Sequence, residues 1–241
     1  MTYRDWLVGT VVSTSMLTPT AKGIVLEVPG WKGSAAGQHV DVRLTAEDGY
    51  QAVRAYSLAS TGPGDTVELA VDLIEDGEVS PYLVHELREG DQLEFRGPLG
   101  RWFVWKPEDG PRPVQLVAGG SGVVPLLAML RAHAASGSEA PFKLLYSVRT
   151  PTDVFYAAEL TELRSPTLDV TFVFTRETPQ GWPQPAGRVS RELLGSATVP
   201  AGEHPAVFVC GPTGFVEAVA DWLVELGHDP VAVKTERFGV N

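Results

Sequence analysis

A glycine-rich turn stands near the middle of the chain, between an apolar run and a helical pattern. Residues 114–118 indicate a short buried strand, and a helix is expected from Val123, with Ser121 as its N-cap and Pro125 in its first turn. Glycine lets the backbone approach a ligand closely, and a helix N-terminus offers N–H groups to a phosphate. The turn is therefore either a nucleotide phosphate site or an ordinary strand-to-helix turn; its residues are Gly119, Gly120, Ser121 and Gly122.

A second group of chemically capable side chains follows an early strand pattern. Arg54 offers a planar fork for phosphate, Tyr56 a flat ring for stacking, and Ser57 a hydroxyl donor. Such a set would suit a ligand with an aromatic ring and a phosphate. Strand alternation places Ser57 on the opposite face from the other two, so the strand must twist at its end. The alternative is a barrel strand with mixed faces.

A short helix is expected to begin after Gly77-Glu78-Val79-Ser80, where Ser80 is followed by Pro81. The start of this helix is either a second phosphate site or a simple serine N-cap.

Cys210 ends an apolar run and is followed by Gly211 and Pro212. In an open α/β sheet, ligands bind at the carboxyl ends of the strands, so Cys210 is expected beside the glycine turn at 119–122. The alternative is a buried structural cysteine. Nucleophilic catalysis is not indicated, because no His–Asp pair accompanies Cys210 in the local sequence.

Two arginines follow neighbouring strand patterns. Arg149 comes after 142–147, and Arg176 comes after 168–174. Arginine at this place suits the 2′-phosphate of NADP, whereas NAD sites often carry a carboxylate there. These arginines are either nucleotide ligands or solvated surface cations.

The elements that must position these residues fall into two groups. Before residue 106, six short runs rich in Val, Leu and Tyr are separated by turn signals, which predicts a six-stranded antiparallel β-barrel interrupted by one helix. The expected strands are 6–14, 23–28, 38–44, 51–58, 66–73 and 92–95, and the helix starts at Ser80.

Three prolines between residues 106 and 113 indicate a linker. After it, strands and helices alternate, which predicts a doubly wound α/β domain with a five-stranded parallel sheet. We therefore expect one domain over 1–108 and another over 109–241. The expected strands are 114–118, 142–147, 168–174, 206–210 and 230–235, and the helices lie near 123–135, 155–164, 189–194 and 213–226.

Composition excludes several classes of function. A net charge of −11 disfavours nucleic acid as a partner. Cys210 is the single cysteine, so the chain itself can hold neither an intrachain disulfide nor a cysteine-ligated iron–sulfur cluster. The histidine spacing indicates no metal site. No apolar run approaches the roughly 20 residues that span a bilayer, and the N-terminus lacks a signal region, so we expect a cytoplasmic protein without membrane insertion.

Taken together, the motifs resemble those of the ferredoxin–NADP reductase superfamily. Arg-x-Tyr-Ser, Gly-x-x-Ser, Gly-Gly-x-Gly-x-x-Pro and Cys-Gly-Pro occur in the family's order and spacing. The resemblance covers nearly the whole chain. It implies an FAD-containing NAD(P)H oxidoreductase, in which hydride passes from nicotinamide C4 to flavin N5 and electrons then leave to a separate acceptor.

The resemblance also implies roles for individual residues. For FAD, these are Arg54 at the pyrophosphate, Tyr56 on the isoalloxazine ring, Ser57 near N5, the backbone of Gly77, Val79 and Ser80 at the phosphates, and Glu236 and Phe238 beside the flavin. For the nicotinamide nucleotide, they are Gly119, Gly120, Ser121 and Gly122 at the pyrophosphate, Cys210 with Gly211 and Pro212 at the nicotinamide, and Arg149, Thr175 and Arg176 at the 2′-phosphate. Ser57, Cys210 and Glu236 would be the catalytic set.

The chain departs from the family pattern at two places. The Lys/Tyr pair that completes the family's NADP phosphate site is replaced by Gln180-Gly181-Trp182-Pro183, and Phe238 is followed by three more residues. NADPH is expected ahead of NADH, and the expected acceptor is a ferredoxin, a flavodoxin or an oxygenase component. The alternatives are a free-flavin or ferric-chelate reductase, or a non-catalytic FAD-binding electron-transfer subunit of a larger complex.

Overall fold

The computed structural model describes residues 5–239, and the chain divides into two compact units. The first contains residues up to Lys106 together with Leu127–Ala132, and the second contains Pro107–Leu126 and the chain from His133 onward. Our domain boundary between residues 108 and 109 stays a prediction. Within the described residues, no helix combines the length and the apolar character that crossing a membrane requires.

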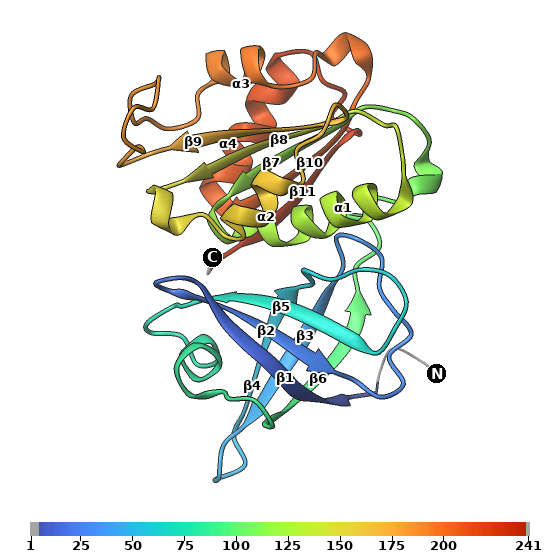
Figure 1. Cartoon of the computed structure of the whole chain (residues 1–241), viewed down its shortest axis with the longest axis vertical. Coiled ribbons are helices and arrows are strands. Elements are labelled where there is room, and N and C mark those ends of the chain that lie inside the picture. The colour runs from blue at the N-terminus through green and yellow to red at the C-terminus, as the bar shows by residue number, and fades with distance from the viewer. Residues whose placement is uncertain (1–4, 240–241) are drawn as a thin grey trace. The chain divides into compact units, whose positions relative to one another are not determined.

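The first unit is a six-stranded antiparallel barrel, as predicted (Figure 1). The sheet order is β4-β3-β6-β1-β2-β5, and an isolated bridge between Leu58 and Leu69 joins the end of β4 to β5. The strands are β1 (Leu7–Thr18), β2 (Ala21–Glu27), β3 (His39–Thr45), β4 (Gln51–Ser57), β5 (Thr66–Asp72) and β6 (Gln92–Leu99).

Alternating side chains fill the barrel, because successive residues of a strand point to opposite faces. Ile24 and Leu26 are fully buried on β2, and Val40 and Val42 are fully buried on β3. The helix that we predict after Ser80 is a short π-helical turn, Tyr82–Glu86, and Leu83 on it packs into the same core. Burial of these side chains is the main driving force for this unit.

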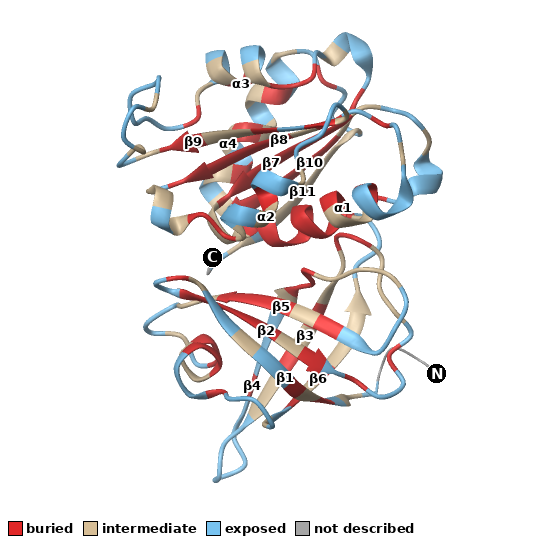
Figure 2. Ribbon diagram, viewed as in Figure 1, coloured by how far each residue is buried: buried red, intermediate tan, exposed pale blue. Residues whose placement is uncertain are grey.

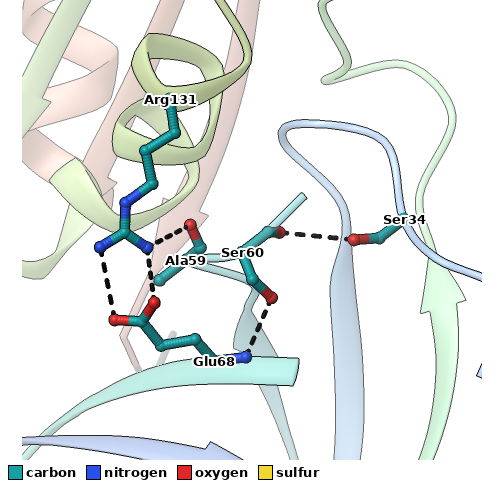
Figure 3. Close-up of polar contacts among 5 residues, drawn as sticks. All are labelled: Ser34, Ala59, Ser60, Glu68 and Arg131. Carbon is teal, nitrogen blue, oxygen red and sulfur yellow. Dashed lines mark hydrogen bonds and ion pairs between the residues drawn. The ribbon is translucent and has the colours of Figure 1, made fainter. Parts of the chain in front are cut away.

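The central part of α1 (Val123–Ser136) belongs to the first unit and is tied to the barrel by Arg131 (Figure 3). Arg131 Nη1 donates to Glu68 Oε2 at 2.6 Å and to the carbonyl oxygen of Ala59 at 2.9 Å. Glu68 is held in turn, since its backbone N–H donates to Ser60 Oγ at 2.9 Å. Charge-assisted contacts of this kind are the stronger hydrogen bonds of a protein, so the segment Leu127–Ala132 is fixed to β5 and its neighbouring loop within the first unit.

The second unit is a five-stranded parallel sheet in the order β11-β10-β7-β8-β9, which confirms the predicted doubly wound fold. Its remaining helices are α2, α3 and α4, and single 3-10 turns lie at Pro107–Asp109, Gly120–Gly122, Pro151–Asp153 and Ala201–Glu203. The strands are β7 (Val114–Gly119), β8 (Phe142–Val148), β9 (Leu168–Phe174), β10 (Ala206–Pro212) and β11 (Val233–Phe238), and the helices are α2 (Ala157–Glu162), α3 (Arg191–Ala197) and α4 (Thr213–Glu225).

The central strands of this sheet are almost continuously buried, as Figure 2 shows for β7, β8 and β10. Such runs are typical of a parallel sheet that is covered on both faces. On one face, α3 and α4 supply Leu194, Val216 and Leu223 to a core with Val117 of β7 and Val209 of β10.

The last strand differs from the prediction. We expect it over 230–235, whereas β11 begins at Val233 and continues through Phe238. Asp229 caps a turn before it, since its side chain accepts a hydrogen bond from the N–H of Val231 at 2.9 Å. The strand therefore starts later, and Glu236 and Phe238 lie within it.

Candidate functional site

The order of the parallel sheet creates a reversal point between β7 and β10. From β7 the chain runs outward through β8 and β9, then returns to β10 on the other side. In open α/β sheets, ligands bind at the carboxyl ends of the strands at such a point. The glycine turn after β7 and the Cys210–Pro212 segment of β10 both lie there.

These two segments touch closely enough to exclude side chains. A Cβ atom on Gly122 would lie 2.3 Å from the carbonyl oxygen of Cys210, and one on Gly211 would lie 2.9 Å from the carbonyl oxygen of Gly119. Gly211 also has a φ of +151°, which side chains rarely adopt. The expectation that Cys210 lies beside the glycine turn is therefore confirmed.

The start of α1 differs from the prediction. A 3-10 turn, Gly120–Gly122, precedes the helix, Gly122 occupies the N-cap position, and no side chain, Ser121 included, makes a capping hydrogen bond there in the described chain. Because Gly122 packs directly on Cys210, the chain turns one residue later than a serine cap would require. Pro125 lies in the first turn, as expected. The N–H of Val123 donates within the 3-10 turn, to the carbonyl oxygen of Gly120, and no side chain takes the other N–H groups at this end, which suits them to an anion.

Cys210 and Glu236 lie side by side on neighbouring strands of this region, with Cys210 buried and Glu236 half-buried. Cys210 is fully buried on β10 and is paired in register with Glu236 on β11. Burial raises the pKa of the Cys210 thiol well above its usual range, and the charge of Glu236 raises it further. Burial also raises the pKa of Glu236 to about 7. The thiol is therefore neutral near neutral pH, whereas the carboxyl can change its charge there.

The two predicted arginines lie at adjacent strand ends. The N–H of Arg176 donates to the carbonyl oxygen of Arg149 at 2.9 Å, and the N–H of Thr175 donates to that of Val148 at 2.8 Å. The two arginines are exposed. They place two cations at the carboxyl ends of β8 and β9, where no acidic residue ends either strand.

In the first unit, the end of β4 presents the second predicted group. Arg54 is exposed, Tyr56 is half-buried against the barrel core, and Ser57 is buried. Burial raises the pKa of Tyr56 to about 12. The Ser57 hydroxyl has no hydrogen-bond partner among residues 5–239. A buried hydroxyl without a hydrogen-bond partner is rare in proteins. Its presence here is explained if a ligand atom accepts a hydrogen bond from it.

The loop Gly77–Ser80 lies between β5 and the π-helical turn. The alternative in which Ser80 is a simple serine N-cap does not hold, because Pro81 occupies the N-cap position and Ser80 Oγ instead accepts from the N–H of Ile74 at 3.0 Å. Val79 is also buried, in the barrel core. Neither side chain faces outward, so only the backbone of this loop is available to a phosphate. The N–H of Gly77, expected to take part, donates instead to the carbonyl oxygen of Ile74 at 2.8 Å, which leaves Val79 and Ser80.

Two residues of this region were not predicted from the sequence: Glu78, within the loop, and Tyr50, which precedes β4. Glu78 Oε2 is ion-paired with Arg54 Nη2, and Glu78 Oε1 accepts from the Tyr50 hydroxyl at 2.7 Å. Two signals could have revealed them. Tyr50 and Arg54 are four residues apart near a strand, hence on the same face, and Glu78 is the acidic residue within a motif proposed to bind phosphate.

Comparison with known proteins agrees with this division of the chain. Residues 11–104 match the family model described as "Oxidoreductase FAD-binding domain", and residues 116–221 match that described as "Oxidoreductase NAD-binding domain". The ferredoxin–NADP reductase B of Sorangium cellulosum is 34% identical over 215 residues, which cover 84% of each chain. The chain belongs to the ferredoxin–NADP reductase superfamily. It is therefore a flavoprotein oxidoreductase with an FAD-binding and a nicotinamide-nucleotide-binding domain.

Two further similarities show how this superfamily fold recurs. The NADH oxidoreductase HCR of Escherichia coli is 35% identical over 196 residues, which are 80% of this chain and 56% of that protein. The FAD/NAD-binding domain of the nitric oxide dioxygenase of Vibrio cholerae O1 biovar El Tor has a TM-score of 0.86 at 24% identity, over 98% of this chain and 100% of that one. The second similarity concerns the fold alone.

Proposed function

We propose that the chain is a reductase that uses NADPH in preference to NADH and delivers electrons through FAD to a separate redox acceptor. The nucleotide preference is supported by the adjacent ends of β8 and β9, where Arg149 and Arg176 are exposed. Arginine forks match phosphate geometry, and a 2′-phosphate is what distinguishes NADPH from NADH.

The residues at the end of β4 fit an FAD. The buried Ser57 hydroxyl would donate to the flavin ring near N5, the half-buried Tyr56 ring would stack on it, and the exposed Arg54 fork would bind the pyrophosphate. The backbone N–H groups of Val79 and Ser80 would hold the phosphates, whereas the N–H of Gly77, also expected there, already donates to the carbonyl oxygen of Ile74 at 2.8 Å. When bound, FAD accepts an electron pair from a reduced nicotinamide and releases electrons singly or in pairs.

The second unit would hold the nicotinamide nucleotide. Gly119, Gly120, Ser121 and Gly122 would bind its pyrophosphate through the uncapped N-terminus of α1, with Gly122 and Gly211 keeping the floor of the site free of side chains. Cys210, Gly211 and Pro212 would position the nicotinamide. Glu236 would hold or release a proton near neutral pH, given its pKa of about 7, and Phe238 would lie beside the flavin.

The acceptor would be a ferredoxin, a flavodoxin or an oxygenase component. A cysteine-ligated iron–sulfur cluster needs about four thiolates, and this chain has one cysteine, so it does not hold such a cluster by itself. Relatives are named as reductase components of a propane 2-monooxygenase and of a glycine betaine monooxygenase, while others are named NADH-cytochrome b5 reductases.

Anaerobic titration of the FAD-loaded chain tests this proposal. The absorption bands of oxidised flavin should bleach much faster with NADPH than with NADH. Equal rates would remove the preference for NADPH. The reduced protein should then pass electrons to ferredoxin or flavodoxin faster than to free FMN or ferric citrate, and the reverse order would favour a free-flavin or ferric-chelate reductase. Flavin that neither nucleotide bleaches would indicate a non-catalytic subunit.

A further inference from the structure

The ion pair between Arg54 and Glu78 joins the two segments of the first unit proposed to hold the FAD phosphates. Arg54 lies on β4, and Glu78 lies in the loop Gly77–Ser80. Arg54 Nη1 donates to the carbonyl oxygen of Val53 at 2.8 Å, and Nη2 contacts Glu78. Both ends of the guanidinium are thus engaged within the chain.

Glu78 is held on its other side by Tyr50, which precedes β4. The Tyr50 hydroxyl donates to Glu78 Oε1, so each carboxylate oxygen of Glu78 has its own donor. Hydrogen bonding to Tyr50 and the charge of Arg54 lower the pKa of Glu78. The carboxylate therefore remains ionised across the working range of most enzymes.

A flavin pyrophosphate and this carboxylate are both anions that need the same cation. The Arg54 side chain is 52% exposed and that of Glu78 is 44% exposed, so a ligand can reach the pair. Exposed ion pairs contribute little stability, about 0.2–1 kcal/mol, and this one can open without loss of the fold. Once displaced, Glu78 would still lie in the loop that is proposed to hold the phosphates.

We propose that Glu78 weakens FAD binding by competing with the flavin pyrophosphate for Arg54, and so sets how tightly this chain retains its flavin. This inference rests on the proposed function, in which Arg54 binds the pyrophosphate. If so, Glu78 lowers the affinity of the site for flavins that carry a phosphate. It does not change the affinity for the isoalloxazine ring alone.

Equilibrium binding to the full-length, flavin-stripped protein tests the proposal. Glu78→Gln keeps the size of the side chain and the Tyr50 contact while removing the charge. It should lower the Kd for FAD by about two- to fivefold. The Kd for riboflavin, which has the same ring system and no phosphate, should not change. Glu75→Gln changes an exposed acid just before this loop that forms no ion pair with Arg54 among residues 5–239. It is the matched control and should change either Kd by less than about twofold.

The Arg54→Ala background separates the possible failures. If Glu78 acts through Arg54, the effect of Glu78→Gln on FAD should fall below about twofold in that background. An unchanged or raised Kd for FAD in the Glu78→Gln single variant, or an equal effect on riboflavin, would overturn the proposal. So would an effect that persists in full without Arg54. If Arg54→Ala alone leaves the Kd for FAD unaltered, the proposed role of Arg54 fails as well.

Discussion

Cys210 and Glu236 are paired in register across the parallel strands β10 and β11, where Cys210 is fully buried and Glu236 is half-buried. The buried thiol lies beside a carboxyl whose negative charge opposes the formation of a thiolate. A cysteine that attacks a ligand must form a thiolate, because the thiolate is the reactive form. The environment of Cys210 disfavours the thiolate, which suits a cysteine that only orients a ligand.

We therefore expect Cys210 to be unreactive in the native protein. At pH 8, a thiol-specific disulfide reagent should modify less than about a tenth of Cys210 in the time that a denatured sample takes to react fully, since burial keeps the pKa of the thiol high. The denatured protein serves as the control, because it exposes the same single cysteine. Rapid, complete modification of the native protein would contradict this account.

The raised pKa of Glu236 predicts a pH-dependent stability. Between about pH 4.5 and 7, the unfolded chain has released this proton and the folded chain still holds it, so the free energy of unfolding falls as pH rises and levels off above about pH 7. The shift from 4.5 to about 7 corresponds to on the order of 3 kcal/mol. Glu236→Gln, which cannot ionise, should therefore be more stable than the wild type at pH 8, and the two should be similar near pH 4.5.

Urea unfolding of both proteins without flavin at the two pH values measures this difference. Glu217→Gln, which alters an exposed carboxylate of α4, is the matched control for the loss of one charge. If Glu236→Gln and Glu217→Gln shift stability equally at both pH values, the carboxyl of Glu236 does not titrate as described.

Two buried serines of the first unit provide a matched comparison. Ser80 Oγ accepts a hydrogen bond from the N–H of Ile74, whereas the Ser57 hydroxyl has no partner within the described chain. In flavin-free protein, Ser80→Ala should lower the free energy of unfolding by about 1–2 kcal/mol. Ser57→Ala should leave it unchanged or raise it by up to about 1 kcal/mol, because it removes a desolvated group that bonds to nothing.

Flavin reduction gives the second part of this test. If Ser57 serves the flavin, Ser57→Ala should slow bleaching by NADPH in stopped-flow measurements on FAD-loaded protein. Destabilisation of the flavin-free Ser57→Ala variant as large as that of Ser80→Ala would show that the Ser57 hydroxyl has a structural partner instead.

The sequence predicted the fold well because the strand and turn signals were clear. Short runs rich in Val, Leu and Tyr between turn signals identified the barrel strands, and the regular succession of strand and helix patterns after residue 113 identified a parallel sheet. What it missed depended on contacts between distant segments. Ser121 and Ser80 have the right residue type for helix caps, yet the packing of Gly122 on Cys210 and the bond from Ile74 to Ser80 decide those two turns.

The same reason explains why Glu78 went unnoticed. Its partners, Tyr50 and Arg54, are 28 and 24 residues away along the chain and come close only when β4 lies beside the loop after β5. Local pattern identifies which residue types stand in a motif. It does not reveal which of them contact one another, because that depends on the register and closure of the barrel.

The close approach of Gly122 to Cys210 leads to a further prediction. Gly122→Ala would place a methyl group 2.3 Å from the Cys210 carbonyl oxygen, so one of the two segments must move. Overpacking of this kind lowers the free energy of unfolding by about 1–3 kcal/mol, and we expect NADPH binding to weaken in parallel.

Gly202→Ala is the matched control, since no atom lies within 4 Å of its new methyl group. Its free energy of unfolding should stay within about 1 kcal/mol of that of the wild type. Equal effects of the two substitutions on NADPH binding, measured by calorimetry, would contradict the assigned role of this contact.

The exposed arginines at the ends of β8 and β9 predict how the nucleotide preference can be changed. A hydrogen bond to a charged group contributes about 1.5–3 kcal/mol, so Arg176→Ala should lower kcat/KM for NADPH by about ten- to a hundredfold, chiefly through KM, and should leave kcat/KM for NADH within about twofold. Arg149→Ala should act in the same direction, because the carbonyl oxygen of Arg149 accepts the N–H of Arg176 and the two strand ends are adjacent. Arg191→Ala is the control. It removes an exposed arginine of α3 that is ion-paired with Glu225 of α4, and it should change kcat/KM for neither nucleotide.

The measurement is steady-state kinetics with both nucleotides at varied salt, since screening should reduce the discrimination between NADPH and NADH if it is electrostatic. Parallel losses for NADPH and NADH in Arg176→Ala would show that this arginine binds a part of the nucleotide common to both, and the preference would then have to come from elsewhere in the second unit.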